Sequence, residues 1–448
     1  MQHVTILIGF SFASQSTDIA FNLAKVLKDK CNHTPLIFGG VHPTIDPISC
    51  LDYCDAVCIG EGEKTILEVA KRLTDGDDFF QTNNLIYKKD GKIIENQLNQ
   101  LIKELDSLPV RRSYTEDHLI IRKGKVFNVD HNMFFEILPN ERTCYTQIFS
   151  RGCPYGCSYC CNSKYKEIYP DWTKIRNKSV SGLIDEISEN IRNNPGIIKV
   201  FIIDDCFLAH DIKWLEEFTA QWKEKVNKEL NFFTIPEYVK KEKLEILKKI
   251  DFSYCSIGLQ SGCKKTNQLY NRKFSKELFL DACNLIKSMD IGLVVNVILD
   301  NPWENDSDIL DTLDVLTRMK KPYYIMQYSL KIYPGTKLYS DCVYEKKKIP
   351  DFNLWYKNYN VIQAIDSNRI MILAQFLPRN LIMNLFKNRE KVYAKISIRC
   401  LYIIACMFIP FHALRVSGSK KLSQNISIIF SHRHYAITWI KGLLGIRN

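Results

Sequence analysis

The stretch that decides the fold is Cys153-Pro154-Tyr155-Gly156-Cys157-Ser158-Tyr159-Cys160, which places three thiols within eight residues directly after a strand-like run. Soft thiolates are natural ligands of iron–sulfur clusters, and closely spaced cysteines on one loop can wrap a cubane. A ferredoxin supplies more cysteines in series, and a zinc ribbon needs a second CxxC that does not follow here. Three ligands for a four-iron cluster leave one iron open to a substrate or cofactor.

The other cysteines give the alternative interpretation, in which the three thiols are incidental core residues. Sixteen cysteines in 448 residues would produce this spacing by chance roughly 0.02 times. We interpret Cys161 as a packing residue beside the cluster, because adjacent residues rarely ligate one cubane without strain. About twelve of the sixteen are expected to be small buried hydrophobes. No secretory signal is expected, since Met1 leads into the apolar run Val4–Ile8, and reduced cytosolic thiols favour metal ligation over disulfides.

Strands and helices alternate after residue 144. The expected strands are Tyr145–Ser150, Lys199–Ile203, Phe232–Thr234, Tyr254–Leu259, Gly292–Leu299 and Tyr324–Ile332. The expected helices are Gly182–Asn193, Ile212–Lys225, Lys241–Lys249, Lys276–Met289 and Asp306–Met319. Six βα units in series predict a partial or full parallel barrel, with its chemistry on loops at the strand carboxyl ends.

The first eighty residues predict a smaller parallel sheet of the doubly wound kind. The expected strands are Val4–Phe10, Pro35–Gly40 and Ala56–Ile59, and the expected helices are Thr17–Lys30, one starting near Pro47, and Lys64–Leu73. The loops Gly39–Thr44 and Gly60–Glu63 follow strands and are expected to line a ligand crevice. A hairpin is expected about Asp90-Gly91, then a linker through Leu105–Pro109 and another hairpin around Gly124.

The predicted fold class is therefore α/β, with a shortened doubly wound sheet, a (β/α)6 partial TIM-like barrel and a helical C-terminal region. The expected boundaries are 1–80 for the first domain, 81–143 for a linker with hairpins, 144–345 for the barrel and 346–448 for a basic accessory region.

The net charge of +11 belongs to the C-terminal region. Residues 369–448 hold thirteen Lys and Arg against one acid, Glu390, so that this region carries 13 − 1 = +12. Within it, 400–414 has no charge and is flanked by Arg399 and Arg415. The run is short for a bilayer span and Pro410 is expected to interrupt it. A buried accessory helix and a helix lying on an anionic membrane both remain open. Nucleic acid is the weaker partner, because no recognised binding module accompanies the charge.

The cysteine spacing, with the aromatic Tyr159 before the last thiol, resembles the signature of the radical S-adenosylmethionine superfamily. Later segments resemble the same superfamily over about 144–340: Phe201–Asp205, Ile257–Gly262, Ile298–Glu304 and Tyr333–Thr336. Gln260 stands where glutamate is commoner, and Asp300 replaces the usual glycine.

This resemblance implies that Cys153, Cys157 and Cys160 hold three irons of a 4Fe–4S cluster and that S-adenosylmethionine chelates the fourth. One electron from the reduced cluster would then break the sulfur–C5′ bond and give a 5′-deoxyadenosyl radical that abstracts a substrate hydrogen. The implied electron donor is a flavodoxin or ferredoxin. No catalytic side chain of the protein itself is assigned.

The resemblance also implies that Tyr159 and several polar side chains contact the cofactor. Asp204 and Asp205 would accept from the methionyl ammonium, and Gln260 or Ser261 would bind ribose or carboxylate. A strand-end cap remains the alternative for the two aspartates, and a satisfied barrel interior for Gln260 and Ser261. The Asp300 side chain is expected to occupy space that the glycine backbone normally leaves open on the adenine side.

The N-terminal segment resembles the second half of the cobalamin-binding domain that precedes many radical enzymes. Gly39, Gly40, His42, Gly60 and Glu61 carry this resemblance and would border cobalamin. The sheet is expected to begin at the third of the family's five strands, so half of the pocket is expected to be missing. His42 is expected to be a surface or capping residue, since nothing identifies it as a cobalt ligand.

The expected function is radical catalysis on a small or lipid-like substrate, by methylation or rearrangement if cobalamin binds. A cobalamin-free radical reaction is the second enzymatic form, and a degenerate cobalamin or iron–sulfur binding protein is the alternative from another class. The expected location is the cytoplasm, with peripheral contact to the membrane inner face through the basic region.

Overall fold

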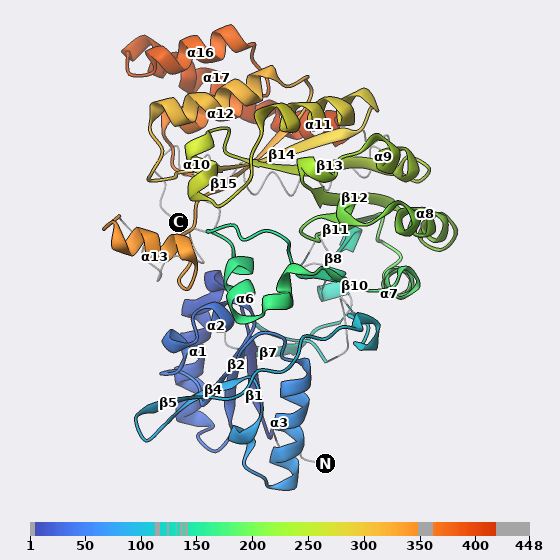
Figure 1. Cartoon of the computed structure of the whole chain (residues 1–448), viewed down its shortest axis with the longest axis vertical. Helices are drawn as coiled ribbons and strands as arrows, with labels where there is room; N and C mark the ends of the chain where they lie inside the picture. Colours follow the sequence, from blue (N-terminus) through green and yellow to red (C-terminus); the bar gives the residue numbers. More distant parts are fainter. Residues whose placement is uncertain are drawn as a thin grey trace.

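The structure is a computed structural model that describes residues 5–112, 117–122, 125–130, 132–134, 138, 142–347 and 362–417. Figure 1 shows two sheets with their helices, the N-terminal one at the bottom of the view and the barrel sheet above it. Helix α6 (Cys161–Ile168) lies between the two. The fold is the α/β architecture that the sequence predicts.

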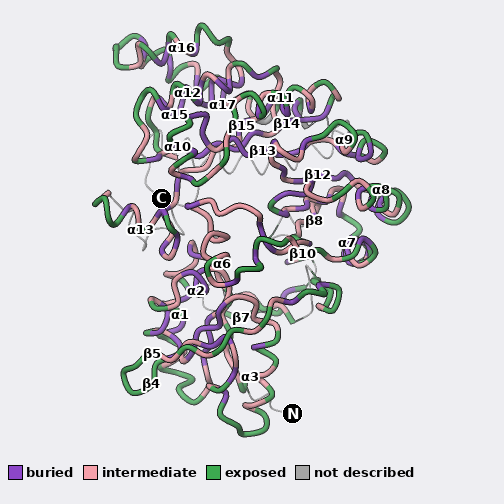
Figure 2. The backbone as a smooth tube through the Cα atoms, viewed as in Figure 1, coloured by how far each residue is buried: buried purple, intermediate pink, exposed green. Residues whose placement is uncertain are grey.

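The N-terminal sheet has five strands in sequence order: β1 (Ile8–Ser11), β2 (Leu36–Gly39), β3 (Ala56–Cys58), β4 (Leu85–Lys89) and β5 (Lys92–Glu95). The first three are parallel, as predicted, while β4 and β5 are antiparallel additions. The predicted hairpin therefore belongs to this sheet rather than to the linker. It does so because Leu85 and Tyr87 bury against Val69 and Phe79, while its turn stays exposed (Figure 2).

Helices α1 (Thr17–Lys30) and α3 (Glu63–Asp75) match the prediction. The helix expected near Pro47 is wrong in position, since α2 (Val41–Ile45) starts directly after β2 and only a 3₁₀ turn, Ile48–Cys50, follows. Gly40 has a φ of +92°, a conformation that favours glycine. The chain thus turns sharply from β2 into α2 at the carboxyl edge of the sheet.

The barrel sheet contains six parallel strands in sequence order, which confirms the predicted series. They are β8 (Cys144–Gln147), β11 (Lys199–Ile202), β12 (Glu229–Thr234), β13 (Phe252–Gln260), β14 (Gly292–Leu299) and β15 (Tyr324–Ser329). The first and last strands do not pair with each other, so the sheet forms an open half-barrel. Short strands β6 (Leu119–Arg122) and β7 (Lys125–Asn128) form a separate hairpin, and β9 (Ser150–Arg151) pairs with β10 (Arg176–Asn177).

The predicted barrel helices all form, and side-chain caps fix several of their starts. They are α7 (Val180–Asn193), α8 (Ile212–Gln221), α9 (Lys241–Leu247), α11 (Lys276–Ser288) and α12 (Asp306–Arg318). Asn305 and Asp308 form a capping box at α12, and Ser179 caps α7. Short helices α10 (Lys264–Leu269) and α13 (Lys337–Tyr344) follow β13 and β15.

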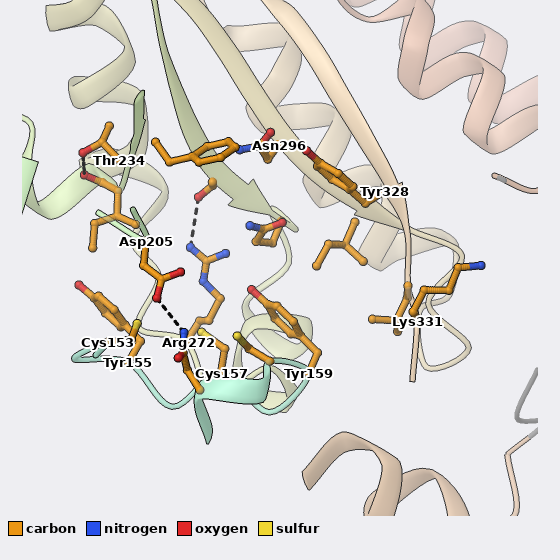
Figure 3. Close-up of a pocket in the computed structure, with 18 of the residues that line it drawn as sticks. Cys153, Tyr155, Cys157, Tyr159, Asp205, Thr234, Arg272, Asn296, Tyr328 and Lys331 are labelled. Carbon is orange, nitrogen blue, oxygen red and sulfur yellow. Dashed lines mark hydrogen bonds between the residues drawn. The ribbon is translucent and has the colours of Figure 1, made fainter. Parts of the chain in front are cut away.

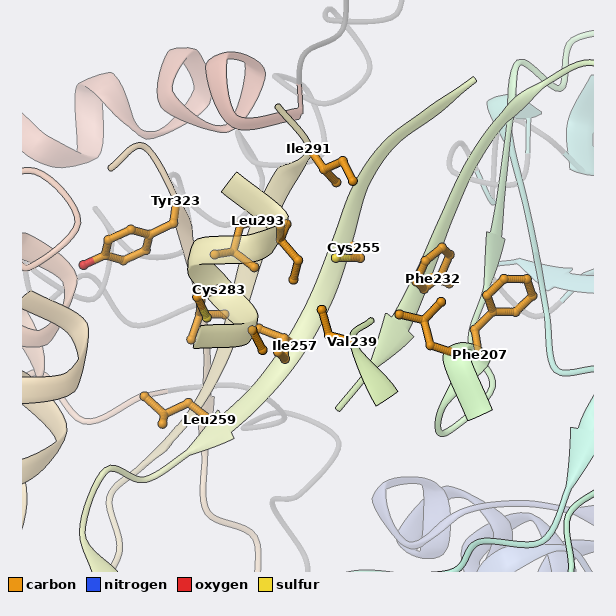
Figure 4. Close-up of a cluster of buried hydrophobic side chains, with 14 of the residues drawn as sticks. Phe207, Phe232, Val239, Cys255, Ile257, Leu259, Cys283, Ile291, Leu293 and Tyr323 are labelled. Atoms are coloured by element: carbon orange, nitrogen blue, oxygen red, sulfur yellow. The ribbon is translucent and has the colours of Figure 1, made fainter. Parts of the chain in front are cut away.

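One large apolar core lies between the barrel sheet and these helices, and Figure 4 shows part of it. Cys255 on β13 and Cys283 on α11 are both buried in it, as small apolar side chains. All sixteen cysteines are free thiols, and nine are buried, eight of them outside the Cys153–Cys160 motif. Many thiols thus serve packing, in line with the usual behaviour of free cysteine.

The C-terminal region packs α15 (Asp366–Leu373), α16 (Arg379–Asn388) and α17 (Val392–Ser417) against the β15 side of the half-barrel. Helix α17 continues through Pro410, so the predicted interruption is wrong. The Asp300 side chain also differs from expectation. Its carboxylate accepts from Gln363 N (3.1 Å) and Asn368 Nδ2 (2.6 Å), tying this region to the end of β14.

Candidate active site

The loop that carries the three cysteines is fixed at its start by backbone geometry. Gly152 has a φ of +98°, and a Cβ there would lie 2.6 Å and 2.7 Å from the carbonyl oxygens of Lys174 and Trp172. Cys153 N donates to Trp172 O at 3.1 Å. Only glycine fits this close approach, so the start of the cysteine loop lies directly against the backbone of residues 172–174.

The far end of the loop is held by the segment after β13. Ser158 N donates to Tyr270 O (3.0 Å), and Ser158 Oγ donates to Leu269 O (2.7 Å). Asn271 Nδ2 donates to Gly156 O (2.8 Å). The loop is therefore anchored to the barrel on both sides.

The three thiols Cys153, Cys157 and Cys160 line one cavity of about 430 Å³ at the carboxyl ends of the barrel strands (Figure 3). No group of three or more His, Cys, Asp or Glu converges on a single metal ion within the described ranges. A cubane binds each cysteine to a different iron, so it needs sulfurs that surround a volume and not a point. The donor set and the cavity fit a 4Fe–4S cluster, which Cys153, Cys157 and Cys160 would hold.

Without iron, the surroundings of the cavity favour the protonated form of the cysteine thiols. Burial raises the pKa of Cys153, and the negative charge of Asp205 raises it further. Burial likewise raises the pKa of Cys157, opposed by the positive charge of Arg272 and a hydrogen bond with Tyr159. Iron binding must therefore displace protons from this site. Cys161 hydrogen-bonds to Cys160 and packs against the aromatic cluster of Tyr165 and its neighbours, as expected of a packing residue.

The two aspartates after β11 have different surroundings. Asp204 lies outside the cavity and is buried, and its Oδ1 accepts from the N–H groups of Phe149 (2.7 Å) and Ser150 (3.1 Å). Burial raises the pKa of Asp204 to about 6. Asp205 lines the cavity, where its Oδ2 accepts from Asn162 Nδ2 at 2.8 Å (Figure 3). Asp204 thus has the capping geometry, whereas Asp205 presents a carboxylate to a ligand.

Gln260 and Ser261 are also adjacent residues with different surroundings. The register of β13 against β14 shifts between Gly258 and Gln260, and Gln260 has a φ of +62°. A bulge of this kind re-aims a side chain, and Gln260 lines the cavity. Ser261 is buried outside it, with its Oγ donating to Glu304 Oε1 at 2.8 Å. Tyr159 also lines the cavity and packs edge-to-face on Tyr270.

Arg272 is a site residue that the sequence reasoning missed. Its side chain enters the cavity near the cysteine loop, and its Nη2 donates to Gly258 O at 3.2 Å (Figure 3). Nη1 is buried and has no hydrogen-bond partner among the described residues. Other missed lining residues come from the same edge of the sheet: Tyr155, Glu237, Lys273, Asn296, Tyr328 and Lys331. Only Glu237 and Lys331 lie just after strands, β12 and β15, and for these two that position was the available signal.

The residues expected to border cobalamin lie where the N-terminal domain meets the barrel. His42 is buried in α2, so its expected surface position is wrong. Its Nδ1 lies 3.0 Å from Ser14 Oγ, and its Nε2 has no partner in the part of the chain described. Burial lowers the pKa of His42, opposed by Asp46. Gly39 and Gly40 precede it at the edge of the sheet.

Gly60 and Glu61 contact the barrel. Gly60 has a φ of +73°, and a Cβ there would overlap the ring of Tyr169. Glu61 accepts two hydrogen bonds from Arg176 (2.7 and 3.1 Å) and pairs with Arg151 Nη1 at 3.3 Å. Because Arg151 and Arg176 are partners in the β9–β10 pair, Glu61 fixes the strand that leads into the cysteine loop.

A second contact joins the domains at the other end of the barrel sheet. Gly335 follows β15 with a φ of +77°, and a Cβ there would overlap the carbonyl oxygen of Ile45 in α2. Ile45 packs with Tyr165, Tyr169 and Trp172 of the barrel. Both edges of the half-barrel therefore touch the N-terminal domain.

Comparisons with known proteins agree with this arrangement. Residues 148–316 match the Radical SAM superfamily, and residues 3–70 match the B12 binding domain. An uncharacterized methyltransferase of Pyrococcus horikoshii is 23% identical over 337 residues, which cover 74% of this chain and 68% of the relative. The hopanoid C-3 methylase of Methylococcus capsulatus is 23% identical over 296 residues, 64% of this chain and 51% of the methylase.

Among solved structures, the cobalamin-dependent S-adenosylmethionine radical enzyme OxsB with aqua-cobalamin bound is similar, with a TM-score of 0.62 and 16% identity. The similarity covers 96% of this chain and 67% of OxsB, and at this identity it shows a shared fold. The chain thus spans about half to two thirds of the length of these proteins.

Proposed function

Because this chain belongs to the radical SAM superfamily and carries a B12 binding domain ahead of the radical SAM domain, we propose that it methylates or rearranges an unactivated carbon of a small or lipid-like substrate. The superfamily makes it an enzyme whose cofactors are a 4Fe–4S cluster and S-adenosylmethionine, and the B12 binding domain supports cobalamin as a third cofactor. The three thiols in one cavity at the carboxyl ends of six parallel strands carry the proposal.

We assign Cys153, Cys157 and Cys160 as the cluster ligands. The anchoring of their loop at Gly152 and Ser158 supports this assignment, since ligands held in place lose little entropy on binding. When bound, the cluster and S-adenosylmethionine supply the one-electron cleavage that produces a 5′-deoxyadenosyl radical. The protein contributes binding, orientation and exclusion of water.

Arg272 is the residue that we assign to the carboxylate of S-adenosylmethionine. A guanidinium with a buried and unpartnered Nη1 is suited to a carboxylate, because its planar fork donates two parallel hydrogen bonds. Asp205 offers an acceptor for the ammonium group, and Gln260 offers an amide for ribose or carboxylate. Asp204 and Ser261 remain predictions for this role, and their hydrogen bonds favour a supporting position.

For cobalamin, we assign Gly39, Gly40 and His42. The support is the unpartnered Nε2 of the buried His42, which has a hydrogen bond to offer a large polar ligand at the sheet edge. Gly60 and Glu61 are engaged by barrel residues, and this favours a cobalamin-free radical reaction as the second candidate function. The two candidates share the cluster and differ at the first domain.

The test is release of 5′-deoxyadenosine from anaerobically reconstituted protein incubated with S-adenosylmethionine and dithionite, with and without cobalamin. We expect release of 5′-deoxyadenosine with and without cobalamin. We also expect cobalamin to co-purify with the protein, detected by its visible absorption. Release without retained cobalamin would favour the second candidate. A complete cluster spectrum with no 5′-deoxyadenosine would contradict the enzymatic proposal.

Two partner assignments are also proposals. The electron donor is a flavodoxin or ferredoxin, by analogy with the superfamily. The location is the cytoplasm with peripheral contact to the membrane inner face, supported by the basic charge of residues 369–448.

A further inference from the structure

The outward face of α17 is apolar along the length of the helix. Seven large side chains on it are each between 50 and 69% exposed: Tyr393, Ile396, Ile403, Ile404, Met407, Phe408 and Phe411. Their spacing of three, four and seven residues places them on one side of a helix. Scattered apolar residues are normal on protein surfaces, but a continuous stripe of this size marks an interaction site.

The opposite face of α17 is packed on the barrel and on α15. Ala394, Ile398, Tyr402, Ala405 and Val416 are buried at matching helical spacing. Beyond the stripe, His412 Nε2 lies 2.8 Å from Tyr323 O, next to the start of β15. The helix is thus attached to the folded domain from its first turn to its last.

This attachment decides between two ways of meeting a membrane. Val392–Ile409 has a mean hydropathy of 1.8 and is long and apolar enough to cross a bilayer by length and composition. A spanning helix would have to carry its packed face, and the barrel strands against it, into the hydrocarbon. Among the residues that the structure describes, the outward stripe is the face of α17 that is available to lipid, and it suits a helix lying parallel to the surface.

The charge around the stripe specifies the kind of surface. On a helical projection Arg399 falls on one flank of the stripe, and Arg415 falls in line with the stripe one turn beyond Phe411; both are exposed. Residues 418–448 continue the sequence with Lys420, Lys421, Arg433, Lys441 and Arg447 and no acid. Basic residues beside an apolar helix face attract anionic lipid headgroups while the apolar side chains enter the acyl boundary.

We propose that the outward face of α17 is a docking surface for an anionic lipid bilayer, on which the enzyme lies with its helix in the plane of the headgroups. The inference does not depend on the radical chemistry. Binding to the membrane surface would give the enzyme access to a lipid-like substrate, because such a substrate is dissolved in the bilayer.

Vesicle flotation with the full chain tests the proposal. We expect the protein to float with vesicles rich in phosphatidylglycerol, to bind pure phosphatidylcholine more weakly, and to be released from both by alkaline carbonate. Met407→Glu and Phe411→Glu should each weaken partitioning by about tenfold or more, since each removes a large apolar side chain from the acyl boundary. Arg399→Gln together with Arg415→Gln should reduce the preference for phosphatidylglycerol.

The matched control is Leu67→Glu, which places the same charge on an exposed apolar position (72%) of α3 in the other domain. It should leave flotation unchanged, and circular dichroism should show that all variants remain folded. Equal flotation of the wild type, Met407→Glu and Leu67→Glu would overturn the proposal. The proposal would also be overturned if light scattering showed that the wild type is a dimer without lipid and that Met407→Glu is a monomer. A second copy of the chain would then cover the stripe.

Discussion

Replacing Glu61 with Gln should destabilise the protein far more than the same change at Glu63, two residues away. Both glutamates pair with Arg151, but only Glu61 also binds Arg176. The Glu61 and Arg176 side chains are 9% and 11% exposed, whereas Glu63 is 37% exposed. Breaking one member of a buried charged pair costs about 3 kcal/mol, and an exposed pair contributes less than about 1 kcal/mol.

The assay is urea unfolding followed by tryptophan fluorescence and circular dichroism at neutral pH. Burial raises the pKa of Glu61, but hydrogen bonds from Arg176 and Ile102, with the charges of both arginines, outweigh it and lower the pKa overall. The stabilisation is therefore complete above the ordinary glutamate range and is lost as the pH falls through the lowered pKa. Equal losses for Glu61→Gln and Glu63→Gln at neutral pH would refute the reasoning.

Three further predictions concern the site. Cys157→Ala should abolish the cluster, seen as loss of iron and of visible absorption after reconstitution, while Cys161→Ala should retain both; retention by Cys157→Ala would remove the ligand assignment. Because burial raises the pKa of Asp204 to about 6, its stabilising contribution is complete below the ordinary aspartate range and is lost as the pH rises through about 6. Asp204→Asn should flatten that part of the stability–pH curve, and an unchanged curve would contradict the shift. Gly60→Ala should lower stability by about 2 kcal/mol or more, from left-handed strain and overlap with Tyr169, and calorimetry showing no change in Tm would contradict the contact.

The sequence predicted the barrel well because its signals are local. Strand β14 was placed with correct bounds at Gly292–Leu299, since its apolar run is bounded by turn residues. The six-strand order followed from the rule that successive βα units lie side by side. The assignment of Leu85–Ile94 to a linker is wrong because β4 pairs with β3, a strand nearly thirty residues earlier in the sequence. No local pattern in the sequence indicates this pairing.

The site was less predictable because it depends on where side chains point. Asp204 and Asp205 are adjacent in sequence, yet only Asp205 lines the cavity. The roles of Gln260 and Ser261 are separated by a bulge that has no clear signature in the residue types. Arg272 reaches the cavity from the segment between α10 and α11, at a distance from the cysteines that no local pattern encodes.

An unclosed arc of six strands has no continuous hydrogen-bonded ring to resist spreading. In this chain the contacts at Glu61 and Gly335 hold the two ends of the barrel sheet against the N-terminal domain. The N-terminal domain thus connects the two ends of the open half-barrel, independently of any ligand that it binds. Excising the N-terminal domain through β5 to obtain a minimal catalytic fragment would remove both contacts together, so the useful unit for engineering is the pair of domains.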